Sequence, residues 1–127
     1  MKNFFFLFVT VCFFATAALA SDFQKAQKIF DELTSLLEKS GQMIAANNSG
    51  DMRTCNRLEK LYAPKLKELY ESSIPLDSDY SYTKQAADVM RWCLYCNDTQ
   101  GNCEYATEIM QKAADQFIRR EKEGKNN

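Results

Sequence analysis

The stretch AADVMRWCLYCNDTQGNCEYATEIM, residues 86–110, decides the fold of this 127-residue chain, because two helices and three cysteines meet in it. Apolar residues recur at helical spacing up to Cys96, which predicts a helix over 83–96. The polar run 97–101 is typical of a turn. Asn102 is a favoured N-cap residue, so a further helix is expected to begin there. The apolar stripe of that helix comprises Cys103, Ala106, Met110, Ala113 and Phe117.

Upstream of this stretch, a first helix is expected over 22–46. Its apolar positions recur mostly every three or four residues and comprise Phe23, Ala26, Phe30, Leu33, Leu37 and Ile44. Glycine often ends helices, but Met43 and Ile44 return to the apolar stripe after Gly41. We therefore expect the helix to continue through Gly41 and to end at the turn-forming run 47–50.

A second helix is expected to begin near Asp51, which is a favoured N-cap residue. Its apolar stripe contains Cys55, Leu58, Leu61, Tyr62, Leu66, Leu69 and Tyr70. Pro64 lies in the middle of this segment, where it removes one backbone hydrogen bond and clashes with the preceding turn. The helix should therefore kink or break near residues 62–63. The segment 72–82, which contains Pro75, is expected to form the longest loop.

Short connections join the four expected helices, so neighbouring helices should run antiparallel. This predicts an all-α protein, an up-down-up-down four-helix bundle with a kinked second helix. Three helix termini meet at one end of such a bundle, and they carry Cys55, Cys93, Cys96 and Cys103. Because helix order and cysteine positions agree, we expect the bundle to be stapled by disulfides at that end.

The four cysteines indicate two disulfides, each of which should add about 2 to 4 kcal/mol to the free energy of unfolding. A bond between Cys93 and Cys96 is the least favoured pairing, because side chains three apart in a helix do not readily reach disulfide geometry. Cys55 is then joined to Cys93 or to Cys96, and Cys103 takes the other. Of these two pairings, Cys55–Cys93 with Cys96–Cys103 is preferred.

Residues 1–20 are predicted to be a cleaved signal peptide. Lys2 gives a positive start, residues 4–14 are largely apolar, and Ala18-Leu19-Ala20 is a small-residue cleavage step. Cleavage also removes Cys12. The remainder, 21–127, has the length of a single domain, and its charged tail over about 119–127 is expected to fray.

Export and paired cysteines predict an oxidising compartment, either a periplasm or the outside of the cell. The sequence does not separate a bacterial from a eukaryotic origin. No other apolar run approaches the length of a membrane span, so no stable membrane insertion is expected after cleavage.

Composition argues against several function classes. The chain has no histidine, which excludes Ser-His-Asp and Cys-His catalysis and histidine-ligated zinc. Its 16 basic and 17 acidic residues nearly balance, so a nucleic-acid partner is not expected. A four-cysteine zinc site is disfavoured because Cys55 and Cys103 are not members of close pairs. No metal site, cofactor or catalytic residue is therefore predicted.

Residues 92–96, WCLYC, resemble the WCxxC outline of thioredoxin-type redox sites. The resemblance implies a thiol-disulfide oxidoreductase that uses Cys93 and Cys96. In such sites the first cysteine lies at a helix N-terminus, where the helix dipole stabilises a thiolate. Here helical residues precede both cysteines, which places them near a helix C-terminus. A structural role in disulfides is therefore preferred.

Tyr80 and Tyr82 alternate with serine in the loop 72–82, close to Asp77 and Asp79. Exposed tyrosines beside acidic residues are common at protein interfaces, so these four residues form the candidate partner-binding site. The alternative is that the tyrosines pack back over the open end of the bundle.

The preferred function is that of a small exported protein that binds a protein partner without catalysis, such as a periplasmic inhibitor, an immunity protein or a secretion accessory protein. One alternative is a carrier that holds a small apolar ligand between its helices, opened by the kinked second helix. The other is the WCxxC oxidoreductase. The identity of the partner does not follow from the sequence, and a homodimer is left open.

Overall fold

The computed structural model describes the backbone of residues 2–126 and the side chains of residues 22–123. Its elements in chain order are α1 (Lys2–Ser49), α2 (Met52–Ser73), the 3-10 helix η1 (Ser78–Tyr80), α3 (Ser81–Cys93) and α4 (Thr99–Asn126). Residues 2–126 contain no strand, so the all-α prediction is confirmed. The predicted cleavage step at 18–20 lies outside the residues whose side chains are described, and it stays a prediction.

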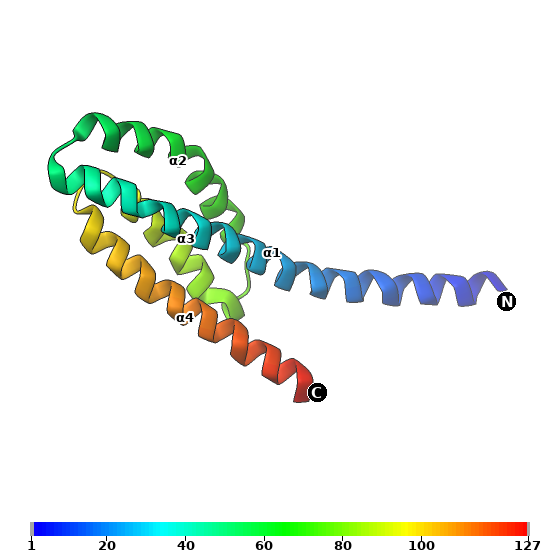
Figure 1. Ribbon diagram of the computed structural model, residues 1–127. Coiled ribbons are helices and arrows are strands. Elements are labelled where there is room, and N and C mark those ends of the chain that lie inside the picture. The colour runs from blue at the N-terminus through cyan, green and yellow to red at the C-terminus, as the bar shows by residue number, and fades with distance from the viewer. Residues whose placement is uncertain (1, 127) are drawn as a thin grey trace.

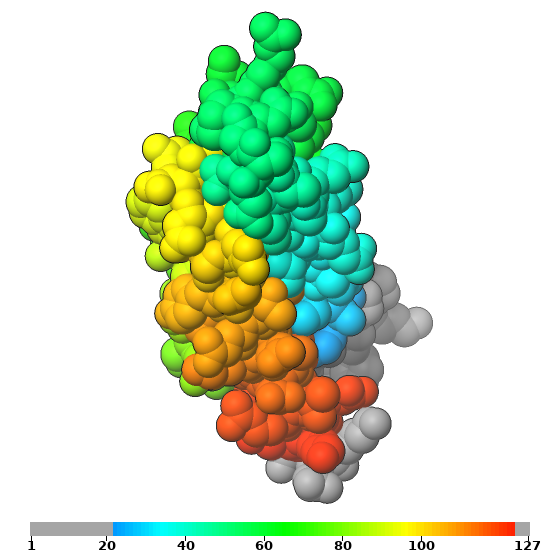
Figure 2. Space-filling model, turned by 60° about the vertical axis from the view of Figure 1, so that its left-hand side comes forward, coloured from blue at the N-terminus to red at the C-terminus, as the bar shows by residue number. Residues whose placement is uncertain are grey.

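The helices form a bundle in which α1 packs against each of the other three, and α3 packs against both α2 and α4. Figure 1 shows the α1–α2 and α3–α4 connections at one end of the bundle and the α2–α3 connection toward the other. On the face drawn in Figure 2, α1 (cyan) and α4 (yellow to orange) lie side by side. Pro64 lies inside one continuous α2, so the chain does not break there, and the kink stays a prediction.

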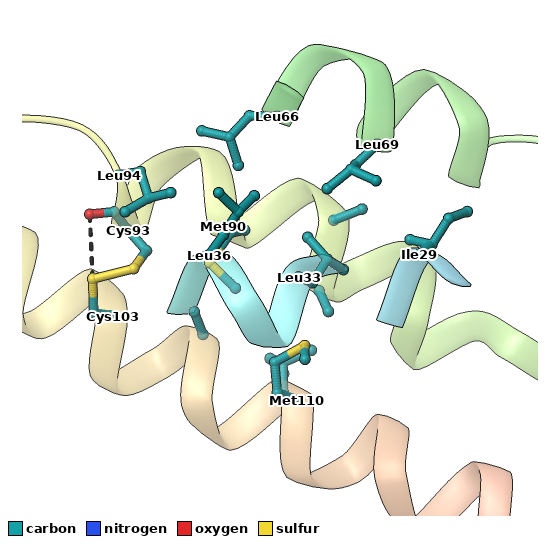
Figure 3. Close-up of a cluster of buried hydrophobic side chains, with 14 of the residues drawn as sticks. Ile29, Leu33, Leu36, Leu66, Leu69, Met90, Cys93, Leu94, Cys103 and Met110 are labelled. Atoms are coloured by element: carbon teal, nitrogen blue, oxygen red, sulfur yellow. Dashed lines mark hydrogen bonds between the residues drawn. A yellow bond between two sulfur atoms is a disulfide. The ribbon is translucent and has the colours of Figure 1, made fainter. Parts of the chain in front are cut away.

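The core forms where apolar side chains of all four helices converge. Figure 3 shows this convergence through Leu33 and Leu36 of α1, Leu66 and Leu69 of α2, Met90 of α3 and Met110 of α4. Full burial of one such side chain contributes roughly 1.5 to 3 kcal/mol of transfer free energy. The apolar stripes therefore supply the main force that holds the helices together.

The core face of α1 agrees with the predicted stripe at Ala26 and Leu33 and differs from it by one position elsewhere. Its buried residues are separated by three or four positions and comprise Ala26, Ile29, Leu33, Leu36, Ser40, Met43 and Ala46. Phe30, Leu37 and Ile44 lie at the edge of this face and are only partly buried. Gly41 lies inside α1 and faces open space, which confirms that the helix continues through it.

The prediction that Leu61 belongs to the core stripe of α2 is wrong, because its side chain is 66% exposed. Leu58 and Leu66 are buried, and position 62 lies four residues from each of them. Residues four apart share a helix face, so Tyr62 takes the inward position and packs against the core. Leu61 is turned away by about 100° from Tyr62.

α3 ends at Cys93, so the predicted helix over 83–96 extends three residues too far. The backbone N–H of Leu94 donates to the carbonyl of Met90 (3.1 Å) as the C-cap hydrogen bond. Cys96 therefore lies in the loop 94–98 and not in a helix.

α4 begins at Thr99, earlier than the predicted start at Asn102. Just before it, Asp98 has a φ of 48°, in the left-handed region that Asp adopts more readily than most residues. The Thr99 hydroxyl is buried and donates to the carbonyl of Tyr95 (2.9 Å). The connection between α3 and α4 is therefore only five residues long, 94–98. Residues 99–101, which were expected to belong to the turn, are helical.

The segment 72–82 is mostly helical, so the prediction of a long loop there is wrong. α2 extends to Ser73 and η1 leads directly into α3, which leaves only residues 74–77 outside helices. Leu76 and Tyr80 are buried and attach this segment to the core.

Candidate functional site

Two disulfides join α2, α3, α4 and the loop 94–98. Cys55 is bonded to Cys96 with Cα atoms 6.0 Å apart, and Cys93 is bonded to Cys103 with Cα atoms 4.3 Å apart. The prediction of two disulfides without a Cys93–Cys96 bond is confirmed. The preferred pairing, Cys55–Cys93 with Cys96–Cys103, is wrong, and the other pairing left open by the sequence is the one observed.

The pairing follows from the point at which α3 ends. Cys93 is the last residue of α3, is fully buried and faces Cys103 of α4 (Figure 3). The Cys103 sulfur also lies 3.2 Å from the Cys93 carbonyl oxygen, which is a contact only, because a disulfide sulfur has no hydrogen to donate. Cys96 lies beyond the helix end, beside α2. Its backbone N–H donates to the carboxylate of Glu59 (3.1 Å), one turn after Cys55.

The WCxxC segment does not form the internal disulfide that a thioredoxin-type site uses. Cys93 and Cys96 are bonded to two different partners. Cys93 also lies at the C-terminus of α3, where the helix dipole disfavours a thiolate. In this arrangement the four cysteines hold helix ends together.

Three aromatic side chains are exposed at the disulfide-bonded end. Trp92 and Tyr95 are 56% and 45% exposed, and their rings meet edge to face with centroids 6.2 Å apart. Tyr105 of α4 is 47% exposed, and its hydroxyl accepts a hydrogen bond from the Gln85 side chain (3.2 Å). Gln85 and Trp92 are seven residues apart on α3 and so share its outer face. We call Trp92, Tyr95 and Tyr105 the aromatic surface.

The backbone that carries the aromatic surface is held firmly. Trp92 precedes Cys93, and Tyr95 precedes Cys96, so each is adjacent to a disulfide. The carbonyl of Tyr95 accepts hydrogen bonds from the Thr99 hydroxyl (2.9 Å) and from the backbone N–H of residue 97 (2.8 Å). Exposed rings on a rigid backbone lose little conformational entropy when they bind, which is favourable for affinity.

Arg91 attaches the helix that bears Trp92 to α2. Its guanidinium lies 3.9 Å from the ring centroid of Tyr70 and forms an ion pair with Asp88. A cation over an aromatic face is attractive by about 0.5 to 1 kcal/mol at an exposed site. This contact therefore contributes to the position of α3 beside α2.

The four residues predicted to bind a partner lie at the opposite end of α3, and most of them hold the η1 turn. Asp77 accepts from the backbone N–H of Asp79 (3.2 Å) and from the Ser78 hydroxyl (3.0 Å), which lowers the pKa of Asp77. The carboxylate of Asp79 forms an ion pair with Arg120 of α4. The carboxylates of Asp77 and Asp79 are therefore both engaged in contacts within the fold.

The expectation that Tyr80 is exposed is wrong, because its side chain is only 7% exposed. The η1 turn directs Tyr80 inward, where its ring lies 5.6 Å from that of Phe117. Tyr82 is half-buried, and its backbone N–H donates to Gln116 (3.2 Å). Tyr80 therefore follows the alternative, in which it packs back over the open end of the bundle. Partner binding by these four residues stays a prediction.

A metal site or a ligand-binding groove is a weaker candidate for the functional site than the aromatic surface. Among the described side chains, no group of three His, Cys, Asp or Glu residues is placed to hold a metal ion. A groove of about 510 Å³ runs between α1 and α4, but it is open to solvent and combines Leu37 and Ile44 with polar groups such as Gln100 and Glu104. Within the described part of the chain, none of the helices is both long enough and apolar enough to cross a membrane.

Comparisons of the chain with protein-family models, with curated proteins and with solved structures found no match. The candidate site therefore depends on its own geometry.

The aromatic surface is not among the residues predicted from the sequence, although one signal for it is present there. Trp92 lies between the buried positions Met90 and Cys93 and about half a helical turn from each of Met90 and Leu94. A tryptophan on the face of a helix opposite its apolar stripe is expected to be exposed.

Proposed function

We propose that the protein is a small exported helical bundle that binds a protein partner through the aromatic surface. The observation that carries the proposal is the exposure of Trp92 and Tyr95 on a backbone anchored by two disulfides. Trp and Tyr dominate the energetically important residues of protein interfaces. A partner that covers these rings would bury apolar area that is now in contact with water.

The compartment and the finer fold form part of the same proposal. The disulfides are in keeping with an oxidising compartment, and the predicted signal at residues 1–20 would direct the chain to a periplasm or out of the cell. The Cys55–Cys96 bond holds the start of α2 beside the loop 94–98, and the proposed architecture is an up-down-up-down order with a kink at Pro64. An inhibitor, an immunity protein or a secretion accessory protein would each use such a rigid surface.

Affinity capture with matched variants tests this proposal. The bait is the exported, oxidised protein, and the variant is Trp92→Ser with Tyr95→Ser. The control variant is Ile74→Ser with Ile118→Ser, which removes two apolar side chains that are 55% and 50% exposed elsewhere. We expect the wild type and the control to capture the same protein from host extract, and the aromatic variant to lose it.

Circular dichroism and thermal unfolding of each bait show whether it is folded. If the folded aromatic variant captures the partner as well as the control does, the proposed binding surface is wrong. Mass spectrometry of the native protein for a retained apolar ligand and an assay of free thiols examine the carrier and oxidoreductase alternatives.

A further inference from the structure

Charge is unevenly distributed on α2. Residues 52–67 contain five basic residues and one acidic residue, whereas the whole chain has a formal charge of −1. The acidic residue, Glu59, is directed at the loop 94–98, where it accepts a hydrogen bond from the backbone of Cys96. One of the basic residues, Lys65, is paired with Glu32 of α1 (3.1 Å) and Glu68 (3.4 Å). The other four cations remain on the outside.

These four exposed side chains are Arg53, Arg57, Lys60 and Lys67, and we call them the cationic face. Their spacing of four, three and seven residues places them in one row along the helix. The row is about 21 Å long, from a rise of 1.5 Å per residue. Among the described side chains, none of the four forms an ion pair with a carboxylate. Arg57 acts on the carboxylate of Asp51 only through a longer-range attraction, so the charge of the row is available to a partner.

The cationic face lies on the outer side of α2, level with the loop 94–98 that is attached to the inner side of the same helix. The Cys55–Cys96 bond joins the first turns of α2 to the loop that carries Tyr95. The hydrogen bond from Cys96 to Glu59 fixes the same loop one turn further along α2, immediately before Lys60. Cys55 and Glu59 are each two residues from Arg57, which places them about 160° away from it around the helix. A partner that binds both surfaces must therefore extend from Trp92 and Tyr95 across α2 to reach this row.

We infer that the cationic face binds an acidic segment of the protein partner that occupies the aromatic surface. This inference rests on the proposed function and names the chemistry of the partner. Four unpaired cations in one row favour a polypeptide with carboxylates at comparable spacing, because complementary charge speeds association and selects the partner.

Other occupants fit the row less well. A membrane surface would need several apolar side chains to insert beyond the cations. Between positions 53 and 67 Leu61 is the one large apolar side chain that is exposed, and the other exposed residues there include Asn56, Ala63 and Pro64. A second copy of the chain could offer the acidic start of α4, with Glu104 and Glu108. That contact would join two different faces head to tail, which need not close into a dimer.

The test measures binding of fluorescein-labelled poly-L-glutamate by fluorescence anisotropy. It compares the full exported chain with Arg57→Glu plus Lys60→Glu and with a control of equal charge change, Lys39→Glu plus Lys122→Glu. We expect the dissociation constant to rise at least tenfold in the first variant and to change less than twofold in the control. Added sodium chloride should weaken wild-type binding, because salt screens exposed charges.

Three results would overturn the inference. They are no binding of poly-L-glutamate by the wild type, equal losses in both variants, or binding of phosphatidylglycerol vesicles in preference to poly-L-glutamate. Sedimentation velocity of the protein alone tests whether a second copy binds the cationic face. Self-association of the wild type that is lost in Arg57→Glu plus Lys60→Glu would also contradict the inference of an acidic partner.

The same charge variant serves as a bait in the capture experiment, which separates this inference from the proposed function. Loss of the partner by the aromatic variant alone would support the aromatic surface and reject the cationic face. Loss by the charge variant alone would support the cationic face and reject the aromatic surface. Loss by both is the expected result.

Discussion

Cys93 is bonded to Cys103, ten residues away, and not to Cys96, which is three residues away. The number of residues between two bonded cysteines decides how strongly the disulfide restricts the unfolded chain. The Cys93–Cys103 bond closes only the α3–α4 turn, whereas Cys55–Cys96 spans 41 residues and ties α2 to the loop 94–98.

The two disulfides should therefore differ in their effect on stability. In the chain-entropy model, closing a loop of 41 residues stabilises by about 4 kcal/mol and a loop of 10 residues by about 3 kcal/mol. We expect Cys55→Ser plus Cys96→Ser to lower the free energy of unfolding by about 1 kcal/mol more than Cys93→Ser plus Cys103→Ser. Urea denaturation of both double variants measures this difference, and the reverse order would contradict it.

Peptide mapping provides the control for that comparison. No Lys or Arg lies between Trp92 and Gln111, so trypsin leaves three of the cysteines in one peptide. Cleavage after Tyr95 by chymotrypsin and before Asp98 by an Asp-specific protease separates them. The fragments should be linked as Cys55–Cys96 and Cys93–Cys103.

A pair of buried threonines should respond in opposite ways to loss of the hydroxyl. Thr83 and Thr99 are both fully buried, but only Thr99 has a hydrogen-bond partner for its hydroxyl, the carbonyl of Tyr95. Thr83→Val should leave stability unchanged or raise it by about 1 kcal/mol, because it removes an unpaired polar atom. Thr99→Val should lower stability by about 1 to 2 kcal/mol. Thermal unfolding of both variants tests the contrast, and a larger loss in Thr83→Val would show that its hydroxyl is satisfied in solution.

Two glycines should also differ when replaced by alanine. Gly41 lies within α1 with open space around its Cα, so Gly41→Ala should stabilise by roughly 0.5 to 1 kcal/mol. Gly50 has a φ of 78° in the turn before α2, where a Cβ is unfavourable. Gly50→Ala should destabilise by about 1 to 2 kcal/mol. Chemical denaturation measures the free energy of unfolding of both variants. A larger loss in Gly41→Ala than in Gly50→Ala would contradict the helical continuity of α1.

Two aspartates should make stability depend on acid pH. The Thr54 hydroxyl and backbone N–H lower the pKa of Asp51 at the start of α2, and the backbone N–H of Asp79 and the Ser78 hydroxyl lower the pKa of Asp77. A carboxyl whose pKa is lower in the folded state stabilises the fold above its unfolded pKa and loses that contribution as the pH falls through its folded pKa. Melting temperature should therefore decrease below about pH 4.

The matched variants for this effect are Asp51→Asn and Asp77→Asn, which retain a side-chain oxygen for the turn or cap. Their melting temperatures should depend less on pH between about 5 and 2 than that of the wild type. An unchanged pH dependence in the double variant would assign the acid sensitivity to other carboxyls.

Local patterns in the sequence were sufficient for the helical class and for the cysteine cluster. Apolar spacing of three and four depends only on the helix repeat, so the four helices and the continuation through Gly41 follow without knowledge of their neighbours. The Cys93–Cys96 bond was disfavoured because both residues were expected in one helix. The bond is absent, but Cys96 lies in the loop 94–98, so that reason does not hold in the structure.

The tertiary structure decided which of several near-equivalent positions faces inward. A change of one residue at a helix turns a side chain by about 100°, so packing determined that Tyr62 lies inward and Leu61 outward. The end of α3 at Cys93 likewise determined both disulfides and left Trp92 and Tyr95 exposed beside them. Helix periodicity could not predict the inward position of Tyr62, the end of α3 or the disulfide pairing, because these depend on the contacts of one helix with another and not on the order of residues within it.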